Sequence, residues 1–532
     1  MKRLAALLAA VILACDPPFT APVFVAAVRV TPDSATLETS GTLQLSAVAT
    51  DSLGHTLSGL RVVWSSSVDS VATVSSAGLV HCLRPGLASI SAVIQGVTGS
   101  ATLHIGIHVT AVHIDQPPVS MVPGGTVAFS AFALDTAQDT LFGRLMTWTT
   151  SDTATLIVSS AGVATARAVG RAFLIAGTAS RRDSIAVTVG LVRFVRLTTG
   201  AWDHTCGLTA DSLTYCWGSN GLGQVGLSTA TGLAPAPVSV PTSPRFATIA
   251  AGAMFTCGGQ ASGAIYCWGS SAGGRLGAGF TETTRSTPVA VATPELLHGL
   301  TTGFAHACAL SSETVFCWGR NPAAGGVVDI NWVPYAVSPV ASFTSVAAAE
   351  TFTCAIAADS AAFCWGQNES GELGNGTIGP STIVPTAVAE SLSFAQVAGG
   401  SSHACGLTGA GTAYCWGLND AGQLGTGDTA TLRASPVAVA GGLRFTTIAA
   451  SGNRTCALTT AGTVYCWGDG VGNAPGPVYG PTTFTSLTVG DDNVCGIGTD
   501  LVAYCWGDNG AGQVGDGTFI PRPAPTRVLG QP

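Results

Sequence analysis

Seven copies of one short pattern constrain this chain more than any other feature. Each copy places a cysteine nine or ten residues before a second cysteine that is followed directly by Trp-Gly, as in CALTTAGTVYCWGDG at Cys456–Gly470. The first cysteines recur about every 50 residues, from Cys206 to Cys495. A repeat of this length with several short strands per unit is typical of a β-propeller or a similar closed array. Seven units in residues 191–532 therefore predict a ring of seven four-stranded blades.

The spacing of the two cysteines predicts a disulfide within each copy. If Cys456 and Cys466 face each other in an antiparallel hairpin, Thr460, Ala461 and Gly462 form the turn, and glycine suits the positive φ that such a turn needs. The Cβ atoms of directly opposed residues lie close enough for a disulfide. Zinc sites instead favour cysteines separated by about two to four residues, a spacing that no copy has. The predicted pairs are Cys206–Cys216, Cys257–Cys267, Cys308–Cys317, Cys354–Cys364, Cys405–Cys415, Cys456–Cys466 and Cys495–Cys505.

The composition favours an all-β fold and argues against nucleic acid as a partner. Only 9% of the residues are charged and 47% are hydrophobic, yet no internal apolar run reaches the roughly 18–20 residues of a membrane-spanning helix. Gly, Ala, Thr, Ser and Val occur in short alternating runs, which indicate strands and turns. The formal net charge is -8 and the only lysine is Lys2, so no basic surface for DNA or RNA is expected.

The N-terminus predicts export. In MKRLAALLAAVILAC, residues 1–14 combine two basic residues with an apolar run too short for a membrane anchor, which is typical of a signal peptide. The ILAC stretch resembles the lipobox of bacterial lipoproteins, which implies that Cys15 is acylated and anchors the protein to a membrane through lipid. An ordinary signal peptide that leaves Cys15 as a free thiol is the alternative. Residues 15–25 are Pro-rich and predict a tether, so we expect the protein at the cell envelope, on its periplasmic face or the cell surface, or secreted.

Two similar segments, residues 26–106 and 107–190, precede the repeats. In each segment a tryptophan, Trp64 or Trp148, lies ten residues before the sequence VSSAG. Strand-length runs, regular turn signals and one tryptophan per segment predict Ig-like sandwiches. The V-x-V-x-P, W-S-S and V-A-T-V-S-x-x-G sequences resemble bacterial Ig-like domains of group 2, which implies a stiff stalk. We expect both tryptophans in the cores and Cys82 buried without a partner.

The repeats also share a longer pattern. Intact units add N-x-x-G-Q-L-G-x-G and P-V-x-V, as in LNDAGQLGTGDTATLRASPVAV, whereas the third and sixth units are shortened after Trp318 and Trp467. These residues resemble the repeat of the regulator of chromosome condensation (RCC1) family over residues 191–532. The resemblance implies a propeller whose Trp-Gly tryptophans fill the space between blades. We expect the ring to close by blade completion, with Pro525–Leu529 joining a sheet with Phe194–Gly200.

The family resemblance does not by itself imply an activity. The founding member is a nucleotide exchange factor for a nuclear GTPase, and its contacts come from loops and a protruding wedge. No unit here exceeds about 51 residues, and the leader directs the chain away from cytosolic GTPases. A GTPase partner is therefore not expected. Secreted bacterial relatives of the propeller include a protein inhibitor of β-lactamase, which implies that the scaffold can present a protein-binding face.

Residues with potential chemistry are few. His204, His306 and His403 each lie two residues before a first cysteine, in alternate units, and should be too far apart to share one metal ion. The Asp-Gly clusters near Asp508 and Asp516 lack the EF-hand spacing and indicate turns. The sequence contains no G-x-S-x-G, H-E-x-x-H or P-loop. We therefore predict structural histidines, no catalytic residue, no metal, no cofactor and no enzyme activity.

The sequence thus predicts an all-β chain with two Ig-like β-sandwiches followed by a seven-bladed β-propeller. Its predicted function is recognition, with the propeller as a protein- or glycan-binding head on an Ig-like stalk. Affinity in such sites usually comes from a few aromatic and arginine side chains. Candidate anchors, chosen because they differ between units, are Trp202, Phe280, Arg285, Trp332 and Arg433. A passive envelope component without a discrete ligand is the main alternative, and a secreted hydrolase is the third.

Overall fold

The computed structural model describes residues 24–532 except 142, 228–231, 242–243, 281–282, 313, 323–327, 338–339 and 429. The predicted signal peptide, Cys15 and nearly all of the tether lie outside the described residues. The described part consists of strands and one short 3-10 helix, η1 (Ala272–Gly274), so the all-β prediction is confirmed. No helix in this part is long and apolar enough to cross a membrane.

The chain divides into two compact units that are described separately. One comprises residues up to Ala111 with Ala133–Arg144, and the other comprises Val112–Phe132 and Leu145–Pro532. The first contains an Ig-like sandwich with sheet orders β1-β4-β5, β2-β10-β9-β6 and β3-β8-β7. Its strands are β1 (Ala27–Thr31), β2 (Ser34–Glu38), β3 (Thr42–Gln44), β4 (Ser46–Thr50), β5 (Thr56–Leu57), β6 (Val63–Ser66), β7 (Ala72–Val74), β8 (Leu79–Cys82), β9 (Gly86–Ile94) and β10 (Val97–Gly106).

The VSSAG sequence forms a turn beneath the tryptophan of this sandwich. Gly78 has a φ of 80°, and a Cβ atom at this position would lie 3.0 Å from the Trp64 ring. Trp64 is half-buried and packs against the core. Cys82 is buried with a free thiol, as predicted, and burial raises its pKa. The glycine is therefore needed because the indole lies directly over it.

The second sandwich repeats this arrangement in residues 111–189. Trp148 lies over Gly162 as Trp64 does over Gly78. Its sheet β16-β19-β20-β12 continues into β24, where Met121 of β12 faces Val238, so the sandwich and the first propeller unit share one eight-stranded sheet. The strands are β11 (Ala111–Ile114), β12 (Val119–Met121), β13 (Thr126–Ala128), β14 (Ala131–Leu134), β15 (Thr140–Leu141), β16 (Thr147–Thr150), β17 (Leu156–Val158), β18 (Val163–Ala166), β19 (Gly170–Gly177) and β20 (Arg182–Val189).

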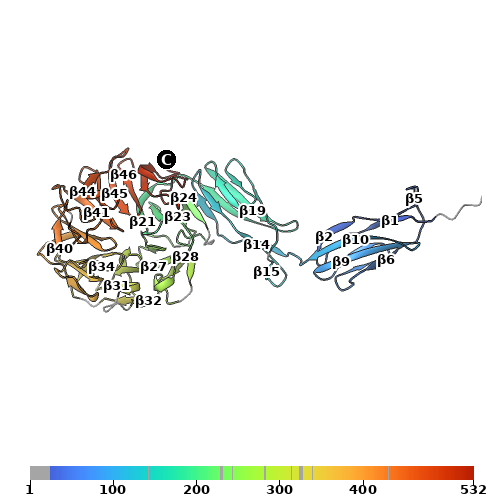
Figure 1. Ribbon diagram of the computed structural model, residues 1–532, viewed down its shortest axis with the longest axis horizontal. Coiled ribbons are helices and arrows are strands. Elements are labelled where there is room, and N and C mark those ends of the chain that lie inside the picture. Colours follow the sequence, from blue (N-terminus) through green and yellow to red (C-terminus); the bar gives the residue numbers. More distant parts are fainter. Residues whose placement is uncertain are drawn as a thin grey trace, which may run out of the picture. The chain divides into compact units, whose positions relative to one another are not determined.

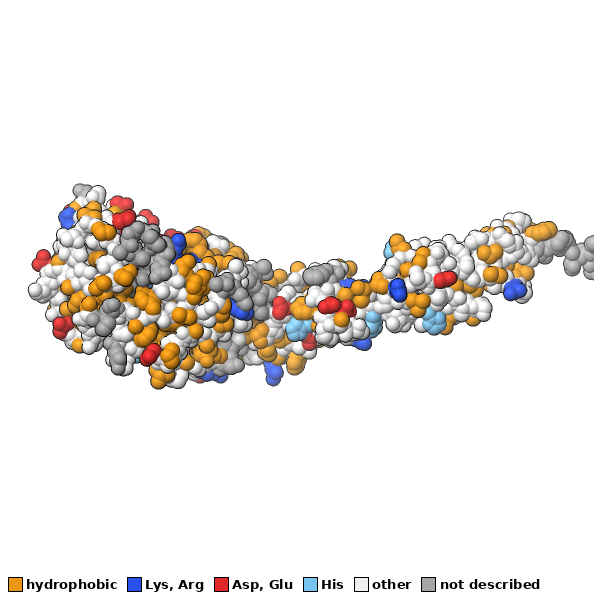
Figure 2. Space-filling model, turned by 90° about the horizontal axis from the view of Figure 1, so that it is seen from below, with side chains coloured by type: hydrophobic (Ala, Val, Ile, Leu, Met, Phe, Trp, Pro, Cys, Tyr) orange, Lys and Arg blue, Asp and Glu red, His pale blue; other side chains and the backbone are white. Residues whose placement is uncertain are grey.

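From Phe194 onward the chain forms successive four-stranded antiparallel units arranged in a ring (Figure 1). We number them one to seven in chain order, from β21–β24 to β45–β48. Each unit runs from its first strand near the ring axis to its fourth strand at the outside. Figure 2 shows only scattered charged side chains on the visible face, as the low charge content predicts.

The strands of the first four units are β21 (Phe194–Thr199), β22 (His204–Thr209), β23 (Thr214–Ser219), β24 (Leu233–Ser239), β25 (Thr248–Ala251), β26 (Phe255–Gly259), β27 (Ile265–Ser270), β28 (Thr284–Ala290), β29 (His298–Thr302), β30 (His306–Leu310), β31 (Val315–Pro322), β32 (Val328–Ala336), β33 (Phe343–Ala348), β34 (Phe352–Ala357), β35 (Ala362–Gly366) and β36 (Thr382–Ala387). Those of the last three are β37 (Phe394–Gly399), β38 (His403–Thr408), β39 (Ala413–Leu418), β40 (Leu432–Ala438), β41 (Phe445–Ser451), β42 (Arg454–Thr459), β43 (Val464–Gly468), β44 (Gly472–Pro477), β45 (Phe484–Val489), β46 (Asn493–Gly498), β47 (Ala503–Gly507) and β48 (Arg522–Arg527).

Each unit contains one buried disulfide between its second and third strands. The bonded pairs are Cys206–Cys216, Cys257–Cys267, Cys308–Cys317, Cys354–Cys364, Cys405–Cys415, Cys456–Cys466 and Cys495–Cys505. The two cysteines of each pair face each other directly in the ladder, so the hairpin register brings their side chains together. In the chain-entropy view, a loop of this length contributes roughly 3 kcal/mol of stability.

The ring does not close by blade completion, so that prediction is wrong. Strand β48 pairs with β47 in the seventh unit, and β21 pairs with β22 in the first. Every unit obtains its fourth strand from its own tail, the segment that follows Trp-Gly. Closure instead relies on contacts between complete sheets, including the hydrogen bond from Thr199 N of β21 to Thr488 Oγ1 of β45 at 3.2 Å. The outer edge strand of unit one, β24, is covered by β12 of the second sandwich.

Candidate functional site

The junctions between neighbouring units are built around the tryptophan of Trp-Gly. Trp467 Nε1 donates to the backbone oxygen of Gln423 at 2.9 Å, in the tail of the preceding unit, and Thr455 Oγ1 donates to the same oxygen at 3.0 Å. Five indoles make this contact: Trp217 with Gln513, Trp268 with Gln224, Trp318 with Arg275, Trp416 with Glu372 and Trp467 with Gln423. The tryptophans therefore fill the space between units, as the resemblance implies.

The three histidines that precede first cysteines also belong to the junctions. His403 Nε2 lies 2.8 Å from Thr455 Oγ1, and since the hydroxyl proton goes to Gln423, the imidazole donates from Nε2. His204 Nε2 lies 3.0 Å from Thr256 Oγ1, and His306 Nε2 lies 2.9 Å from Thr353 Oγ1. All three are buried, and burial lowers each pKa to about 4. They join three separate junctions and do not form one site.

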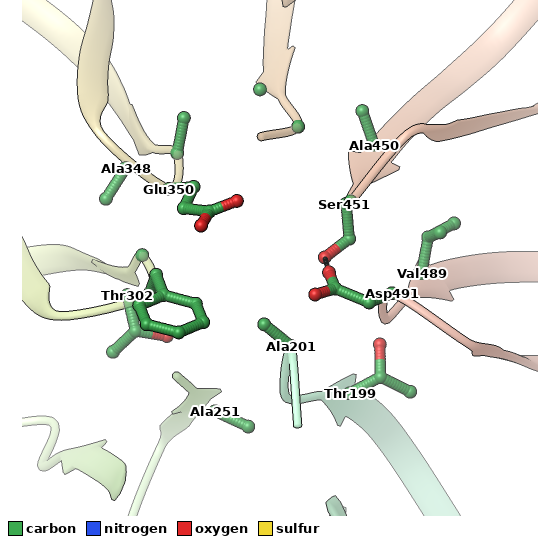
Figure 3. A pocket seen from close by; sticks show the side chains of 16 residues that line it. Thr199, Ala201, Ala251, Thr302, Ala348, Glu350, Ala450, Ser451, Val489 and Asp491 are labelled. Atoms are coloured by element: carbon green, nitrogen blue, oxygen red, sulfur yellow. Dashed lines mark hydrogen bonds between the residues drawn. The ribbon is translucent and has the colours of Figure 1, made fainter. Parts of the chain in front are cut away.

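A cavity of about 80 Å³ lies at one end of the ring axis and is lined by residues of every unit (Figure 3). We call it the axial mouth. Its walls are the last residues of the first strands and the turns that follow them. The lining residues are Thr199, Ala201, Ala251, Thr302, Gly303, Phe304, Ala348, Ala349, Glu350, Gly399, Gly400, Ala450, Ser451, Gly452, Val489 and Asp491.

One position of these turns has a different residue in every unit. It lies four residues before the first cysteine and is occupied, in chain order, by Trp202, Ala253, Phe304, Glu350, Ser401, Gly452 and Asp491. By contrast, the second cysteine, the tryptophan and the following glycine are the same in all seven units. The residues that hold the ring together thus repeat, while those at the rim of the mouth do not.

Two carboxylates face each other across the mouth. Glu350 and Asp491 point into the cavity from opposite sides in Figure 3, and they are the ionisable residues of its lining. Ser451 Oγ donates to Asp491 Oδ1 at 2.6 Å. Burial, followed by the charges of Glu350, Asp492 and Asp203, raises the pKa of Asp491 to about 6 although the Ser451 hydrogen bond opposes this. The mouth is therefore a negatively charged, partly desolvated site above about pH 6.

An aromatic pair lies next to the carboxylates. The rings of Trp202 and Phe304 meet edge to face with their centroids 5.2 Å apart, and Trp202 remains 47% exposed. Phe304 lines the cavity. Aromatic faces and carboxylates both attract cations, so this set of side chains is suited to a positively charged group.

The five predicted anchors do not form one surface. Trp202 belongs to the rim of the mouth, whereas Arg285, Trp332 and Arg433 lie on the fourth strands β28, β32 and β40. The guanidinium of Arg285 lies 4.9 Å from the centre of the half-buried Phe280 ring. Arg433 forms an ion pair with Asp428 at 2.7 Å. Only Trp202 combines exposure with a place beside a cavity.

The mouth residues that sequence reasoning missed are Phe304, Glu350, Ser451 and Asp491. Phe304, Glu350 and Asp491 share the position four residues before the first cysteine, and its variation between units is the signal that could have found them.

The Asp-Gly clusters behave as turns in the structure. Asp516 accepts from Thr518 N at 3.0 Å and from Arg522 Nε at 2.6 Å, and Asp508 accepts from Gln513 Nε2 at 3.0 Å. Among the described residues, no group of three or more His, Cys, Asp or Glu side chains could hold a metal ion.

Comparison with known families identifies both parts of the chain. Residues 177–476, more than half of the chain, match the RCC1-like domain family, and residues 24–105 match the bacterial Ig-like domain (group 2). The resemblance to the RCC1 family is thereby confirmed, and the resemblance to bacterial Ig-like domains is confirmed for the first of the two segments.

Relatives and solved structures agree with this assignment. Human E3 ubiquitin-protein ligase HERC2 is 30% identical over 50% of this chain, and the ultraviolet-B receptor UVR8 of Arabidopsis thaliana is 28% identical over 52%. The chain spans 5% of HERC2 and 66% of UVR8. Human WBSCR16 (TM-score 0.55, 18% identity, 60% of this chain and 94% of that one) and Prp20p of Saccharomyces cerevisiae (0.54, 21%, 64% and 87%) share the fold. The chain belongs to the RCC1-like domain family, with a bacterial Ig-like domain at its N-terminal side.

Proposed function

We propose that this protein is an exported cell-envelope protein whose propeller recognises a protein partner at the axial mouth. The observation that carries the proposal is the rim position that differs in all seven units while the junction residues repeat. It places Glu350 and Asp491 in the lining of one cavity and the exposed Trp202 against the lining residue Phe304. A partly buried carboxylate with a raised pKa costs stability, and such groups concentrate at functional sites.

A basic side chain is the group that suits this mouth best. Both ionisable lining residues are acidic, and the Trp202–Phe304 pair offers aromatic surface beside them. The cavity of about 80 Å³ exceeds the volume of roughly 30 Å³ that one water occupies in the liquid, so it has room for an ammonium or guanidinium group. We therefore favour a protein that inserts a lysine or arginine over a neutral glycan.

The comparisons support binding more than catalysis. Yeast RCC1 (Prp20) has been solved bound to Kap60, and Prp20p is described with binding properties toward Gsp1p and histones. HERC2 is a ligase by name, but this chain spans only 5% of it. We propose no reaction, and we propose neither a GTPase nor nucleic acid as the partner.

The test is titration of the full oxidised chain with a lysine-rich peptide and with the same peptide acetylated on its lysines. We expect saturable binding of the basic peptide only, weakened about tenfold by Glu350→Gln, since a desolvated charge pair contributes roughly 1.5–3 kcal/mol. Glu295→Gln, which changes an exposed residue outside the mouth, is the matched control.

The pH dependence provides a second readout of the same site. Asp491 has a pKa of about 6, so its negative charge is lost as the pH falls below that value. Affinity for the basic peptide should rise between pH 5 and pH 7, and Asp491→Asn should flatten this rise. Absence of saturable binding to peptides and envelope proteins would favour the passive envelope component. Selective binding of a neutral glycan would replace the protein partner, and turnover of a defined substrate would support a hydrolase.

Export and lipid anchoring are proposed from the leader and from the seven buried disulfides, which persist in oxidising compartments. Cells grown with labelled palmitate should label the wild-type protein and place it in the membrane fraction. Cys15→Ala should lose both the label and the membrane association. Unlabelled wild-type protein in the medium would instead indicate an ordinary signal peptide.

A further inference from the structure

The junction between units six and seven differs from the junctions that are filled by a tail. The segment from Trp416 to Val439 in unit five corresponds to Trp467–Val478 in unit six, which is shorter by twelve residues. The two valines are equivalent, since Val439 N donates to Ala413 O and Val478 N donates to Val464 O at the same place in the ladder. Unit six therefore lacks the G-Q-L-G segment that lies against the next tryptophan elsewhere.

A groove of about 730 Å³ lies at the place of the missing tail. Its lining includes Val494 and Trp506 of unit seven, which correspond to Thr455 and Trp467 of unit six. In unit six, these two residues donate to the carbonyl of Gln423. Trp506 Nε1 has no hydrogen-bond partner among the described residues, and the threonine is replaced by a valine. The groove thus retains the indole donor but has no main-chain acceptor for it.

The walls of the groove are aromatic and positively charged. Tyr479, which is 83% exposed, lies on one side, and the charged lining residues are Arg454 and Arg522, with no carboxylate among the lining. Arg522 is paired with Asp516 at 2.6 Å, whereas the Arg454 guanidinium donates to the backbone oxygen of Asp469 at 3.2 Å. In a chain with a net charge of -8, this local excess of arginine favours an acidic ligand.

We propose that this groove binds an extended, acidic peptide segment of a partner protein, which takes the place that a tail occupies at the filled junctions. A main-chain carbonyl of the segment accepts from Trp506 Nε1, as Gln423 O does from Trp467. A carboxylate of the segment lies near Arg454. The site is separate from the axial mouth and does not depend on it.

The probe for this site is available within the chain itself. A fluorescein-labelled peptide with the sequence of residues 419–428, NDAGQLGTGD, copies the tail that contacts Trp467 and carries two aspartates. Its fluorescence anisotropy is followed as the full oxidised chain is added. We expect saturable binding of this peptide and none of a scrambled version.

Three variants identify the groove as the binding place. Trp506→Phe keeps an aromatic ring but removes the indole N–H donor. It should weaken binding about fivefold, the equivalent of one modest hydrogen bond. Arg454→Gln should weaken binding and reduce its salt dependence. Grafting the unit-five tail between Trp467 and Val478 should fill the groove and abolish binding. Trp202→Phe, at the axial mouth, is the matched control and should leave the affinity for the 419–428 peptide unchanged.

Three outcomes would contradict or reassign this binding site. No saturable binding by the wild-type chain, or binding by the grafted chain at wild-type strength, would overturn the proposal even if Trp506→Phe folds poorly. Binding of a neutral oligosaccharide that Trp506→Phe abolishes, with the peptide inert, would assign the groove to glycan instead. Since Trp506→Phe, Arg454→Gln and the grafted tail leave the mouth residues unchanged, the lysine-peptide titration distinguishes failure here from failure of the proposed function.

Discussion

Two kinds of junction alternate around most of the ring, and the comparison between them shows how the repeat tolerates change. In one kind a buried histidine bonds to a threonine of the next unit, as His403 does to Thr455. In the other, the same two positions hold phenylalanine and alanine, as in Phe352 with Ala404, which share one apolar cluster. The polar pair and the apolar pair occupy the same positions in their junctions. Either pair can therefore join two units, provided that both of its members change together.

Six of the seven junctions follow this rule, and the junction between units six and seven is the exception. Histidine or asparagine accompanies threonine, phenylalanine accompanies alanine, and Arg454, which turns toward Asp469 O, accompanies valine. The pairs are His204–Thr256, Phe255–Ala307, His306–Thr353, Phe352–Ala404, His403–Thr455, Arg454–Val494 and Asn493–Thr205. Opposite phenylalanine, a buried threonine oxygen would have no donor and would face a larger ring, which explains why threonine appears only opposite a polar side chain.

Acidification should affect the histidine junctions most strongly. Each of the three histidines has a folded pKa of about 4, below the unfolded value of 6.5, so the unfolded state binds more protons and stability falls as the pH drops through this range. From pH 7 to pH 5 the loss is roughly 2 kcal/mol for each histidine. Asp491, whose pKa is raised to about 6, gains a proton in the folded state and offsets about 1 kcal/mol. Urea unfolding of the oxidised chain should thus show a net loss of roughly 5 kcal/mol. An unchanged stability at pH 5 would contradict the buried neutral state.

Replacing one member of a polar pair breaks the comparison directly. His403→Phe should cost roughly 3 kcal/mol, because it leaves the Thr455 hydroxyl without its donor and introduces a larger ring. His403→Phe with Thr455→Ala recreates the Phe352–Ala404 arrangement and should recover most of the loss. Urea unfolding of both single variants and the double variant gives the coupling energy. Additive effects, without coupling, would show that the two positions are chosen independently.

Much of the fold could be predicted because the determining contacts are local. Each disulfide joins strands of one hairpin, so the ten-residue spacing sets the register by itself. The repeat length and the Trp-Gly pattern also lie within single units, so they were sufficient to predict the propeller. The partner of each histidine could not be found by spacing, because His403 and Thr455 are separated by 52 residues and meet only across a junction.

The axial mouth was even harder to predict from the sequence, because its residues meet only in the closed ring. Glu350 and Asp491 come from units four and seven and become neighbours only when all units surround one axis. The choice of anchors treated variable residues as exposed, but the Arg433 side chain of β40 pairs with Asp428 in the loop before this strand. Ring closure was mispredicted because the C-terminal strand β48 pairs with β47 of its own unit and not with β21.

The two kinds of junction also differ in the tail residue whose carbonyl oxygen accepts from the tryptophan, and this difference should have the smallest effect on stability. Where the junction is hydrogen-bonded and the tail is intact, the tail residue beneath the tryptophan is Gln224, Gln423 or Gln513, whereas the apolar junctions have Arg275 or Glu372.

Glu372 keeps half of the contacts that glutamine makes. Its Oε2 accepts from Ser370 N at 2.8 Å, as Gln423 Oε1 accepts from Ala421 N. Its Oε1 is buried and has no partner among the described residues. Burial raises the pKa of this carboxyl, so its charge weakens the folded state as the pH rises. Glu372→Gln should therefore stabilise the chain at pH 7.5 by about 1 kcal/mol, with less gain at pH 5. Thermal unfolding at both pH values measures this, and a destabilised variant would show that the carboxylate itself is needed at this junction.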